Sequence, residues 1–295
     1  MIRHRFDRNA LTLFDDANGT KVRLAVGTYL RAGRPELVDL KITDYCAFGC
    51  TFCYQGSTKL GKHATWDNLE TVVAELKAAK VFEVAIGGGE PTDHPDFVRL
   101  LKAFRDAGVV PNFTTKYPAV VRKLWPEIHR YVGAFAYSAE TVTDIFAAKH
   151  HFDSAGISRK RVNLHYVMGL HDSDHFKSYL RAAHKCGYRV TLLGYKTTGR
   201  GGDVIPVPYE WWMSVVSELV DRRQCPDLSI DTPLAAAYAG DMPVAERLFH
   251  TQEGAFSMYI DAVAMTYGAS SFEPGETLLP FTSNWIPGFR QLVLA

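Results

Sequence analysis

The feature that most constrains the fold is an alternation of two hydrophobic patterns along residues 37–227. Short apolar runs, typical of buried strands, alternate with segments whose apolar residues recur at helical spacing. Strands are predicted at residues 38–43, 82–86, 109–114, 132–138, 162–168 and 189–195. Repeated βα units imply an α/β fold with a parallel sheet that is either doubly wound or curled toward a barrel. In both arrangements the functional site lies at the carboxyl ends of the strands.

The helical pattern is clearest in two sets of apolar residues at i, i+3, i+4, i+7 spacing: Leu69, Val72, Val73 and Leu76, and Trp212, Val215, Val216 and Leu219. Residues 1–36 read as an N-terminal extension with a hairpin around Asn18-Gly19. After about Leu228 the βα alternation is expected to stop. Residues 228–295 are richer in Pro, Gly, Ser and aromatic residues, with one strand predicted at 257–265, and are interpreted as a cap that helps form the substrate region.

Charge and hydropathy exclude several classes of function. The chain has 33 Lys and Arg against 32 Asp and Glu, a formal net charge of +1, which gives no electrostatic case for binding nucleic acid or a membrane surface. No stretch approaches the roughly 20 apolar residues of a membrane helix, and the first ten residues lack the apolar region of a signal peptide. We therefore expect a soluble protein of the cytoplasm.

Three of the five cysteines fall within eight residues, on the segment that follows the first predicted strand. Five cysteines are too few for a disulfide scaffold in a chain of this length, and clustered thiols indicate a metal. Cys46, Cys50 and Cys53 can ligate three corners of a cubane cluster and leave one iron open, because soft sulfur ligands favour iron-sulfur clusters or zinc. Two alternatives stay open: a zinc site with His63 as fourth ligand, and a thioredoxin-like pair, which leaves Cys46 unexplained.

The C-x3-C-x2-C spacing, with an aromatic residue before the last cysteine and a position after the first strand, resembles the radical S-adenosylmethionine (SAM) superfamily. The resemblance covers about residues 37–200 and implies a partial (β/α)6 barrel. It also implies a 4Fe-4S cluster on Cys46, Cys50 and Cys53, with SAM chelating the fourth iron through its amino and carboxylate groups. Phe52 would shield the cluster, and the backbone near Tyr54 would meet the adenine of SAM.

A glycine-rich run, residues 86–92, ends the second predicted strand. Successive glycines let the backbone approach a ligand closely, and the Glu90 carboxylate can accept from a cation. A phosphate site is disfavoured, because Glu90 would repel phosphate. Gly88, Gly89 and Glu90 are similar to the glycine-rich motif of the superfamily, which hydrogen-bonds the ammonium group of SAM.

Polar residues also mark the tips of the third, fourth and fifth predicted strands. Ser138 and Glu140 suit vicinal hydroxyls, and the resemblance implies contacts with the ribose and methionyl ends of SAM; alternatively, Glu140 only begins a helix. Thr114 and Thr115 are weaker candidates for the same ligand. His165 lies within an otherwise apolar strand, either as a site residue or as a structural one.

The sixth predicted strand continues into residues 193–202, similar to the superfamily segment whose backbone borders adenine, which places Leu193 beside SAM. Lys196 and Arg200 are candidates to neutralise a carboxylate of SAM or of the substrate, and a solvated loop is the alternative.

Residues 253–262 resemble the hairpin of the SPASM/twitch extensions of radical SAM maturases, but Ser270 and Ser271 stand where a cysteine would be expected. We therefore expect a single cluster, since an auxiliary one needs three or four thiolates.

The resemblance implies an enzyme that reductively cleaves SAM and uses the 5′-deoxyadenosyl radical to abstract hydrogen from a substrate C–H bond. Its electron would come from a one-electron reductant of the flavodoxin or ferredoxin type. The tail favours a peptide substrate. A nucleotide or another small molecule is the alternative substrate, and a non-catalytic iron-sulfur or zinc module is the alternative of another class.

Overall fold

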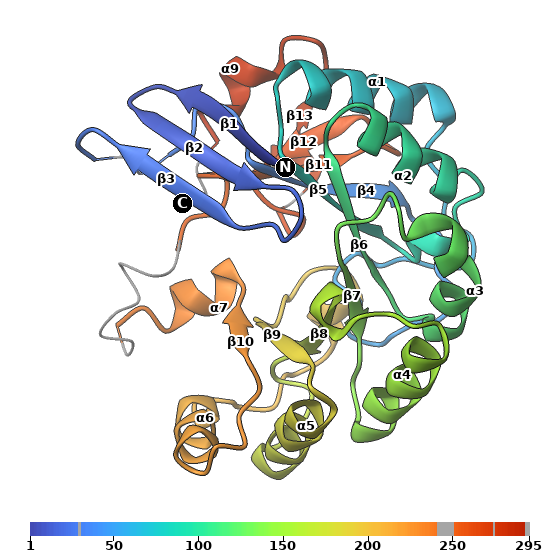
Figure 1. Cartoon of the computed structure of the whole chain (residues 1–295), viewed down its shortest axis with the longest axis vertical. Helices are drawn as coiled ribbons and strands as arrows, with labels where there is room; N and C mark the ends of the chain where they lie inside the picture. The colour runs from blue at the N-terminus through green and yellow to red at the C-terminus, as the bar shows by residue number, and fades with distance from the viewer. Residues whose placement is uncertain (29–30, 241–250, 274, 293–295) are drawn as a thin grey trace.

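The computed structural model describes residues 1–28, 31–240, 251–273 and 275–292 (Figure 1). Its main sheet has ten strands in the order β10-β9-β8-β7-β6-β5-β4-β11-β12-β13, and a separate sheet has the order β1-β2-β3. The main sheet is open, with β10 and β13 at its two edges, and Figure 1 shows helices α1 to α6 as an arc outside its strands. This is the α/β architecture predicted from the alternating pattern.

The six predicted core strands are confirmed, with bounds shifted by a few residues. They are parallel neighbours: β4 (Leu37–Thr43), β5 (Glu83–Gly88), β6 (Val110–Thr115), β7 (Phe135–Ser138), β8 (Val162–Val167) and β9 (Arg189–Leu193). The helices that follow them are α1 (Trp66–Ala78), α2 (Phe97–Asp106), α3 (Pro118–Ile128), α4 (Val142–Ser154), α5 (Ser173–Cys186) and α6 (Trp212–Asp221). Short 3-10 turns are η1 (Pro91–Asp93), η2 (Arg159–Arg161) and η3 (Gly199–Asp203).

Local sequence explains where these helices begin and which side they bury. Helix α1 begins after Thr65, whose hydroxyl accepts from the Asn68 N–H at 3.3 Å, and it buries Leu69, Val72 and Leu76 against the sheet. The predicted apolar face of this helix is thus confirmed. Between sheet and helices lies one continuous hydrophobic core, which holds the outer side of every core strand in place below the strand tips.

The expectation that the βα alternation stops after Leu228 is wrong. Strand β10 (Leu228–Ile230) pairs in parallel with β9, and helix α7 (Thr232–Ala237) follows it, capped by Asp231, whose carboxylate accepts from the Leu234 N–H at 3.1 Å. A strand of three residues and a helix of six are too short to show a hydrophobic period, which is why the pattern does not predict them.

The predicted strand 257–265 is shorter than expected. Strand β11 (Ser257–Asp261) ends where the Asp261 carboxylate accepts from the N–H groups of Val263 and Ala264, which turns the chain into β12 (Thr266–Gly268). β11 pairs in parallel with β4, so the tail joins the core sheet. The hairpin continues through η4 (Gly275–Thr277) and β13 (Leu279–Pro280) to α9 (Trp285–Phe289).

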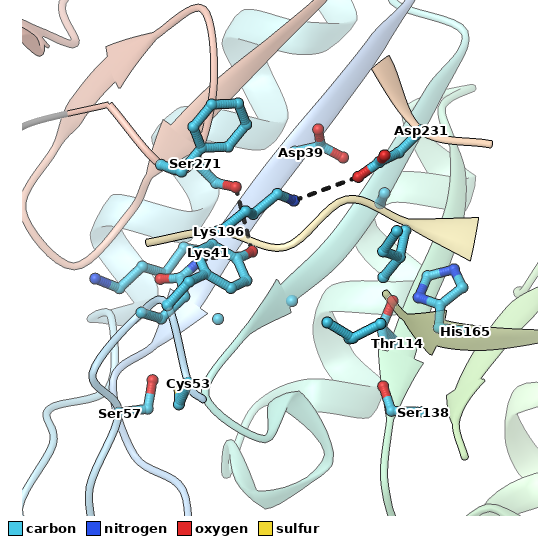
Figure 2. A pocket seen from close by; sticks show the side chains of 18 of the residues that line it. Asp39, Lys41, Cys53, Ser57, Thr114, Ser138, His165, Lys196, Asp231 and Ser271 are labelled. Carbon is cyan, nitrogen blue, oxygen red and sulfur yellow. Dashed lines mark hydrogen bonds and ion pairs between the residues drawn. The ribbon is translucent and has the colours of Figure 1, made fainter. Parts of the chain in front are cut away.

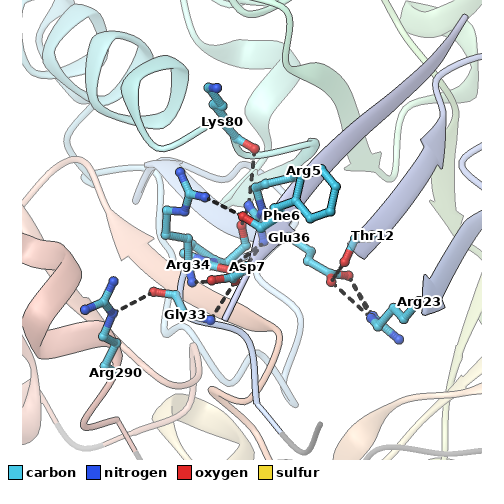
Figure 3. Close-up of polar contacts among 11 residues, drawn as sticks. Arg5, Phe6, Asp7, Thr12, Arg23, Gly33, Arg34, Glu36, Lys80 and Arg290 are labelled. Carbon is cyan, nitrogen blue, oxygen red and sulfur yellow. Dashed lines mark hydrogen bonds and ion pairs between the residues drawn. The ribbon is translucent and has the colours of Figure 1, made fainter. Parts of the chain in front are cut away.

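The N-terminal segment forms a three-stranded antiparallel sheet of β1 (Ile2–Asp7), β2 (Ala10–Asp15) and β3 (Lys21–Ala25). The predicted hairpin at Asn18-Gly19 is confirmed, and Gly19 adopts a left-handed conformation with φ of +78°. Buried polar contacts fasten this sheet to the main body (Figure 3). Arg5 donates to the carbonyls of Arg34, Pro35 and Lys80.

No helix in the described part of the chain combines the length and the apolar character needed to cross a lipid bilayer.

Candidate active site

A cavity of about 500 Å³ opens at the carboxyl ends of the core strands, between them, the cysteine loop (residues 44–58) and the tail. Of the residues that the sequence assigns to the cluster or to SAM, Arg200 does not line it, and the following do: Cys46, Cys50, Phe52, Cys53, Tyr54, Gly88, Gly89, Glu90, Thr114, Ser138, Glu140, His165 and Leu193. In Figure 2, Cys53 lies on one side of this cavity, with Thr114, Ser138 and His165 on the other. Residues separated by more than a hundred positions in the chain therefore meet at one site.

The cysteine loop is held by its own backbone and by the loop after β9. The Cys46 N–H donates to the Thr58 carbonyl at 2.9 Å. Arg200 donates from its backbone N–H to the Cys53 carbonyl at 3.0 Å and from Nε to the Cys50 carbonyl at 2.9 Å. Its guanidinium thus binds the cysteine loop, whereas the sequence predicted that it would neutralise a carboxylate of SAM or of the substrate.

Two glycines let neighbouring backbone approach this loop closely. A Cβ atom on Gly89 would lie 2.0 Å from the Tyr45 carbonyl oxygen, and one on Gly199 would lie 2.4 Å from that of Tyr54. Both positions therefore require glycine, and both serve to seat the cysteine loop against the strand tips. The glycine-rich run has a packing role here in addition to any contact with a ligand.

The three thiols fit a cluster ligand set. Cys46, Cys50 and Cys53 are free and only partly buried, and no fourth cysteine lines the cavity. Burial raises the pKa of the Cys46 thiol, and the nearby Glu90 and Cys50 add to the shift. In the described ranges, no three His, Cys, Asp or Glu side chains converge as ligands of a single ion. A cubane takes each thiolate on a different iron, so these donors need not converge.

His63, the fourth ligand of the alternative zinc site, is engaged elsewhere. Its Nδ1 lies 2.8 Å from the Thr43 hydroxyl, and its ring packs against those of Tyr45 and His94, with centroids 5.5 and 5.1 Å away. His63 does not line the cavity that contains the three cysteines. The zinc alternative therefore lacks its fourth donor.

Glu90 is almost completely buried and joins the end of β5 to the end of β6. Its Oε1 accepts from the hydroxyls of Thr92 and Thr115 at 2.6 and 2.7 Å, and its Oε2 accepts from the Lys116 N–H at 2.9 Å. Burial raises the pKa of Glu90, which these hydrogen bonds partly offset. The carboxylate thus fixes the geometry of two strand tips that line the cavity.

Lys116, which the sequence reasoning missed, stands beside the cysteine loop. Its Nζ lies 3.3 Å from the Cys50 Sγ, contacts the Glu140 carboxylate, and lies 5.7 Å from the centre of the Phe52 ring. Burial lowers the pKa of Lys116, but the contacts with Glu140 and Cys50 outweigh it and hold the pKa above its usual value. The only indication in the sequence is its place directly after the Thr114-Thr115 strand tip.

Glu140 does not begin the following helix. Helix α4 begins after Thr141, whose hydroxyl accepts from the Asp144 N–H in a capping box. The Glu140 side chain instead lines the cavity and pairs with Lys116. His165 also lines the cavity; burial, together with the charge of Lys196, lowers its pKa to about 4, so its imidazole is neutral at pH 7.

The end of the cavity away from the cysteines is charged. Of its charged residues, the sequence predicted only Lys196 as part of a site. Asp39 on β4, Lys196 after β9, Asp231 after β10 and Glu253 before β11 all line it. Figure 2 shows Lys196 directed toward Asp231, with Asp39 beside them. Single carboxylates spread over more than two hundred residues form no motif, so only the fold brings them together.

Comparison with known proteins agrees with this geometry. The family model described as the radical SAM superfamily matches residues 40–199. The PqqA peptide cyclase of Bradyrhizobium diazoefficiens is 34% identical over 98 residues, which cover 32% of this chain and 26% of that protein. The mycofactocin maturase MftC of Mycolicibacterium smegmatis is 24% identical over 191 residues, 58% of this chain and 47% of that protein. The matched part thus spans about a quarter of one relative and about half of the other.

Solved structures share the fold at low sequence identity. SuiB of Streptococcus suis bound to the precursor peptide SuiA has a TM-score of 0.73 at 13% identity, covering 98% of this chain and 87% of SuiB. The structure of anSMEcpe with AdoMet and the Cp18Cys peptide has a TM-score of 0.59 at 10% identity, covering 83% of this chain and 76% of that one. The family model covers more than half of the chain, and the chain therefore belongs to the radical SAM superfamily, whose members bind a 4Fe-4S cluster and S-adenosylmethionine.

Proposed function

We propose that this protein reductively cleaves SAM at a single 4Fe-4S cluster and abstracts hydrogen from a C–H bond of a peptide. The observation that carries the proposal is that the three cysteines and the predicted SAM residues line the same cavity. The cluster and SAM, when bound, supply the radical chemistry, and the protein supplies placement and exclusion of water.

The residues that line the cavity would divide between the cluster and SAM according to their position. Cys46, Cys50 and Cys53 would ligate the cluster, since they are the thiols that line the cavity. The backbone of Gly88 and Gly89 would face the amino group of SAM, and Glu90 would hold that backbone in place through its contacts with the next strand tip.

The remaining polar residues would hold the rest of SAM. Ser138 and Glu140 would hold its ribose and methionyl groups, with Thr114 beside them, because all three lie at neighbouring strand tips. His165 and Leu193 would border the adenosyl group, and Phe52 and the backbone of Tyr54 would close over the cluster and the adenine.

A peptide substrate is supported by what the similar proteins are: a peptide cyclase, a mycofactocin maturase, and a structure that holds a precursor peptide. The tail contributes Glu253, Tyr259 and Ser271 to the same cavity, so it would form part of the substrate site. A flavodoxin or ferredoxin in the cytoplasm would supply the electron. The cysteine loop suits such a partner, because Gly49 and Thr51, which flank Cys50, are exposed.

The test is anaerobic. The protein is reconstituted with iron and sulfide, reduced with dithionite and given SAM, and 5′-deoxyadenosine is measured by mass spectrometry. We expect about four irons per chain, and product that Cys53→Ala abolishes. A protein that binds the cluster but releases no 5′-deoxyadenosine, with or without added peptide, would be a cluster-bearing module, and zinc in place of iron would overturn the proposal.

A further inference from the structure

The charged end of the cavity, away from the cysteines, is built from four separate segments of the chain. Asp39 comes from β4, Lys196 from the loop after β9, Asp231 from the cap of α7 and Glu253 from the segment before β11. These four residues are called the acidic end below. What we infer for the acidic end rests on the proposed function, because these residues line the cavity that would hold SAM and substrate.

Other charged groups in the cavity are already compensated. Lys41 Nζ lies 2.9 Å from an Asp261 carboxylate oxygen and also contacts Asp44. Lys116 is paired with Glu140. Neither lysine therefore has a free charge to offer the acidic end.

Within the acidic end, one ammonium faces three carboxylates. Lys196 Nζ lies 3.8 Å from Asp231 Oδ2, longer than a hydrogen bond, and that oxygen is buried without a hydrogen-bond partner among the described residues. The same ammonium lies 4.8 Å from the centre of the Tyr54 ring and 5.1 Å from that of Phe272. Lys196 is thus held in place by an acid and two aromatic rings.

The side-chain carboxylates of Asp39 and Glu253 form no hydrogen bond and no ion pair with another described residue. Asp39 lies deep within the fold, yet its side chain is exposed to the cavity. Asp39 is exposed and Glu253 partly exposed, and both line the cavity, so each carboxylate is accessible to a ligand bound there. Burial raises the pKa of Asp39 to about 6 and that of Glu253 to about 7, as expected for acids that lack a full set of partners.

We propose that the acidic end binds a cationic nitrogen group of the substrate, an ammonium or a guanidinium, with Asp39 and Glu253 as its partners. In a peptide this group is the side chain of Lys or Arg. The ion pair of Lys196 with Asp231 borders the site and leaves the other two carboxylates for the ligand. A cation placed there brings the formal net charge of the four residues from −2 to −1 and gains charge-assisted hydrogen bonds to both acids.

The experiment titrates capped tripeptides into the chain of residues 1–295 by anaerobic calorimetry, with and without cluster and SAM. The peptides are Ac-Gly-X-Gly-NH2 with X as lysine, arginine, norleucine, citrulline or glutamate. We expect the lysine or arginine peptide to bind about tenfold or more tightly than its neutral counterpart. Agmatine and cadaverine separate the two sources of the cation, since a free amine that matches the peptide indicates a small-molecule substrate.

Asp39→Asn and Glu253→Gln should each weaken binding of the cation about tenfold, to the level of the neutral peptide. Glu70→Gln removes a carboxylate from the exposed side of α1 and serves as the matched control. Circular dichroism of each variant checks folding. Equal binding of cationic and neutral peptides, tighter binding of the glutamate peptide, or a preference that survives both substitutions would overturn the proposal.

The two proposals fail separately. SAM cleavage without a preference for cations would overturn the acidic end as a cation site and leave the proposed reaction standing. A preference for cations in a protein that cleaves no SAM would overturn the proposed reaction and leave the cation site standing, because the titration does not depend on turnover.

Discussion

At the scale of single residues, Lys116 connects the cysteine loop to the strand tips that face it. Its Nζ lies 3.3 Å from the Cys50 Sγ, so it brings a donor and a positive charge to a cluster ligand. Hydrogen bonds and charge near the sulfurs tune the potential of a cluster, and a cation stabilises the reduced form. Lys116→Met should therefore make the reduction potential of the reconstituted cluster more negative, measured by potentiometric titration followed by electron paramagnetic resonance.

The matched variant for this prediction is Lys123→Met, which removes an exposed lysine from α3. Its cluster should keep the potential of the unaltered protein. If Lys116→Met also keeps that potential, the ammonium does not act on Cys50 once the cluster is bound, and its role is confined to the ion pair with Glu140.

A second prediction at the scale of single residues concerns Glu90 and the stability of the folded protein. Glu90→Ala leaves the Thr115 hydroxyl and the Lys116 N–H without their buried acceptor, so it should lower the free energy of unfolding by about 2–4 kcal/mol. Glu90→Gln keeps the shape and one acceptor oxygen and should cost about half as much. Urea unfolding of the cluster-free protein measures both, and equal losses in the two variants would contradict a role in hydrogen bonding.

The residues of the site differ in how far the sequence could predict them. The three cysteines and the glycine-rich run are contiguous motifs, and every residue chosen from them lines the cavity. Lys116, Asp39, Asp231 and Glu253 were missed, because a single charged residue after a strand is common in any α/β protein. Their roles come from neighbours that only the fold supplies.

At the scale of elements, the N-terminal sheet is fastened by polar groups rather than by its own core. The Arg5 guanidinium donates to three backbone carbonyls, and Arg23 pairs with the buried Glu36 carboxylate at 2.7 Å (Figure 3). Arg5→Met should lower the free energy of unfolding by about 3 kcal/mol, because it leaves buried acceptors unpaired. Chemical unfolding measures this loss.

The control for Arg5 is Arg222→Met, which removes an exposed arginine that pairs with Glu218 at 3.0 Å on α6. A surface pair of this kind contributes little, so the change should stay within about 0.5 kcal/mol. A comparable loss in both variants would mean that the Arg5 contacts do not fasten the sheet.

The elements show what a hydrophobic pattern can and cannot predict. Long strands and helices were predicted because each repeats its period several times, as α1 does with Leu69, Val72 and Leu76. β10 and α7 are too short for a period, and no local pattern specifies that β11 pairs with β4. We propose that residues 37–227 are the catalytic core, 1–36 an extension and 228–295 a cap, with β11 joining the cap to the core sheet.

At the scale of the whole molecule, the acidic end links folding to pH. Burial, and next the charge of Asp39, raise the pKa of Glu253 to about 7. Because this exceeds the value in the unfolded chain, the folded protein holds more protons between about pH 4.5 and 7, and stability falls as pH rises through that window. Above pH 7 the contribution is lost. Asp39 and Asp231, whose pKa values burial also raises, face the same cavity as the ammonium of Lys196.

Glu253→Gln removes this dependence, since glutamine carries no proton that folding can bind. Relative to the unaltered protein, the variant should gain stability as pH rises from 5 to 8, by on the order of 2 kcal/mol. Urea unfolding at four pH values measures the difference, with Glu70→Gln as the exposed control. A constant difference across the range would show that Glu253 ionises as it does in the unfolded chain. A difference that vanishes when the cationic peptide is present would place the ligand on this carboxylate.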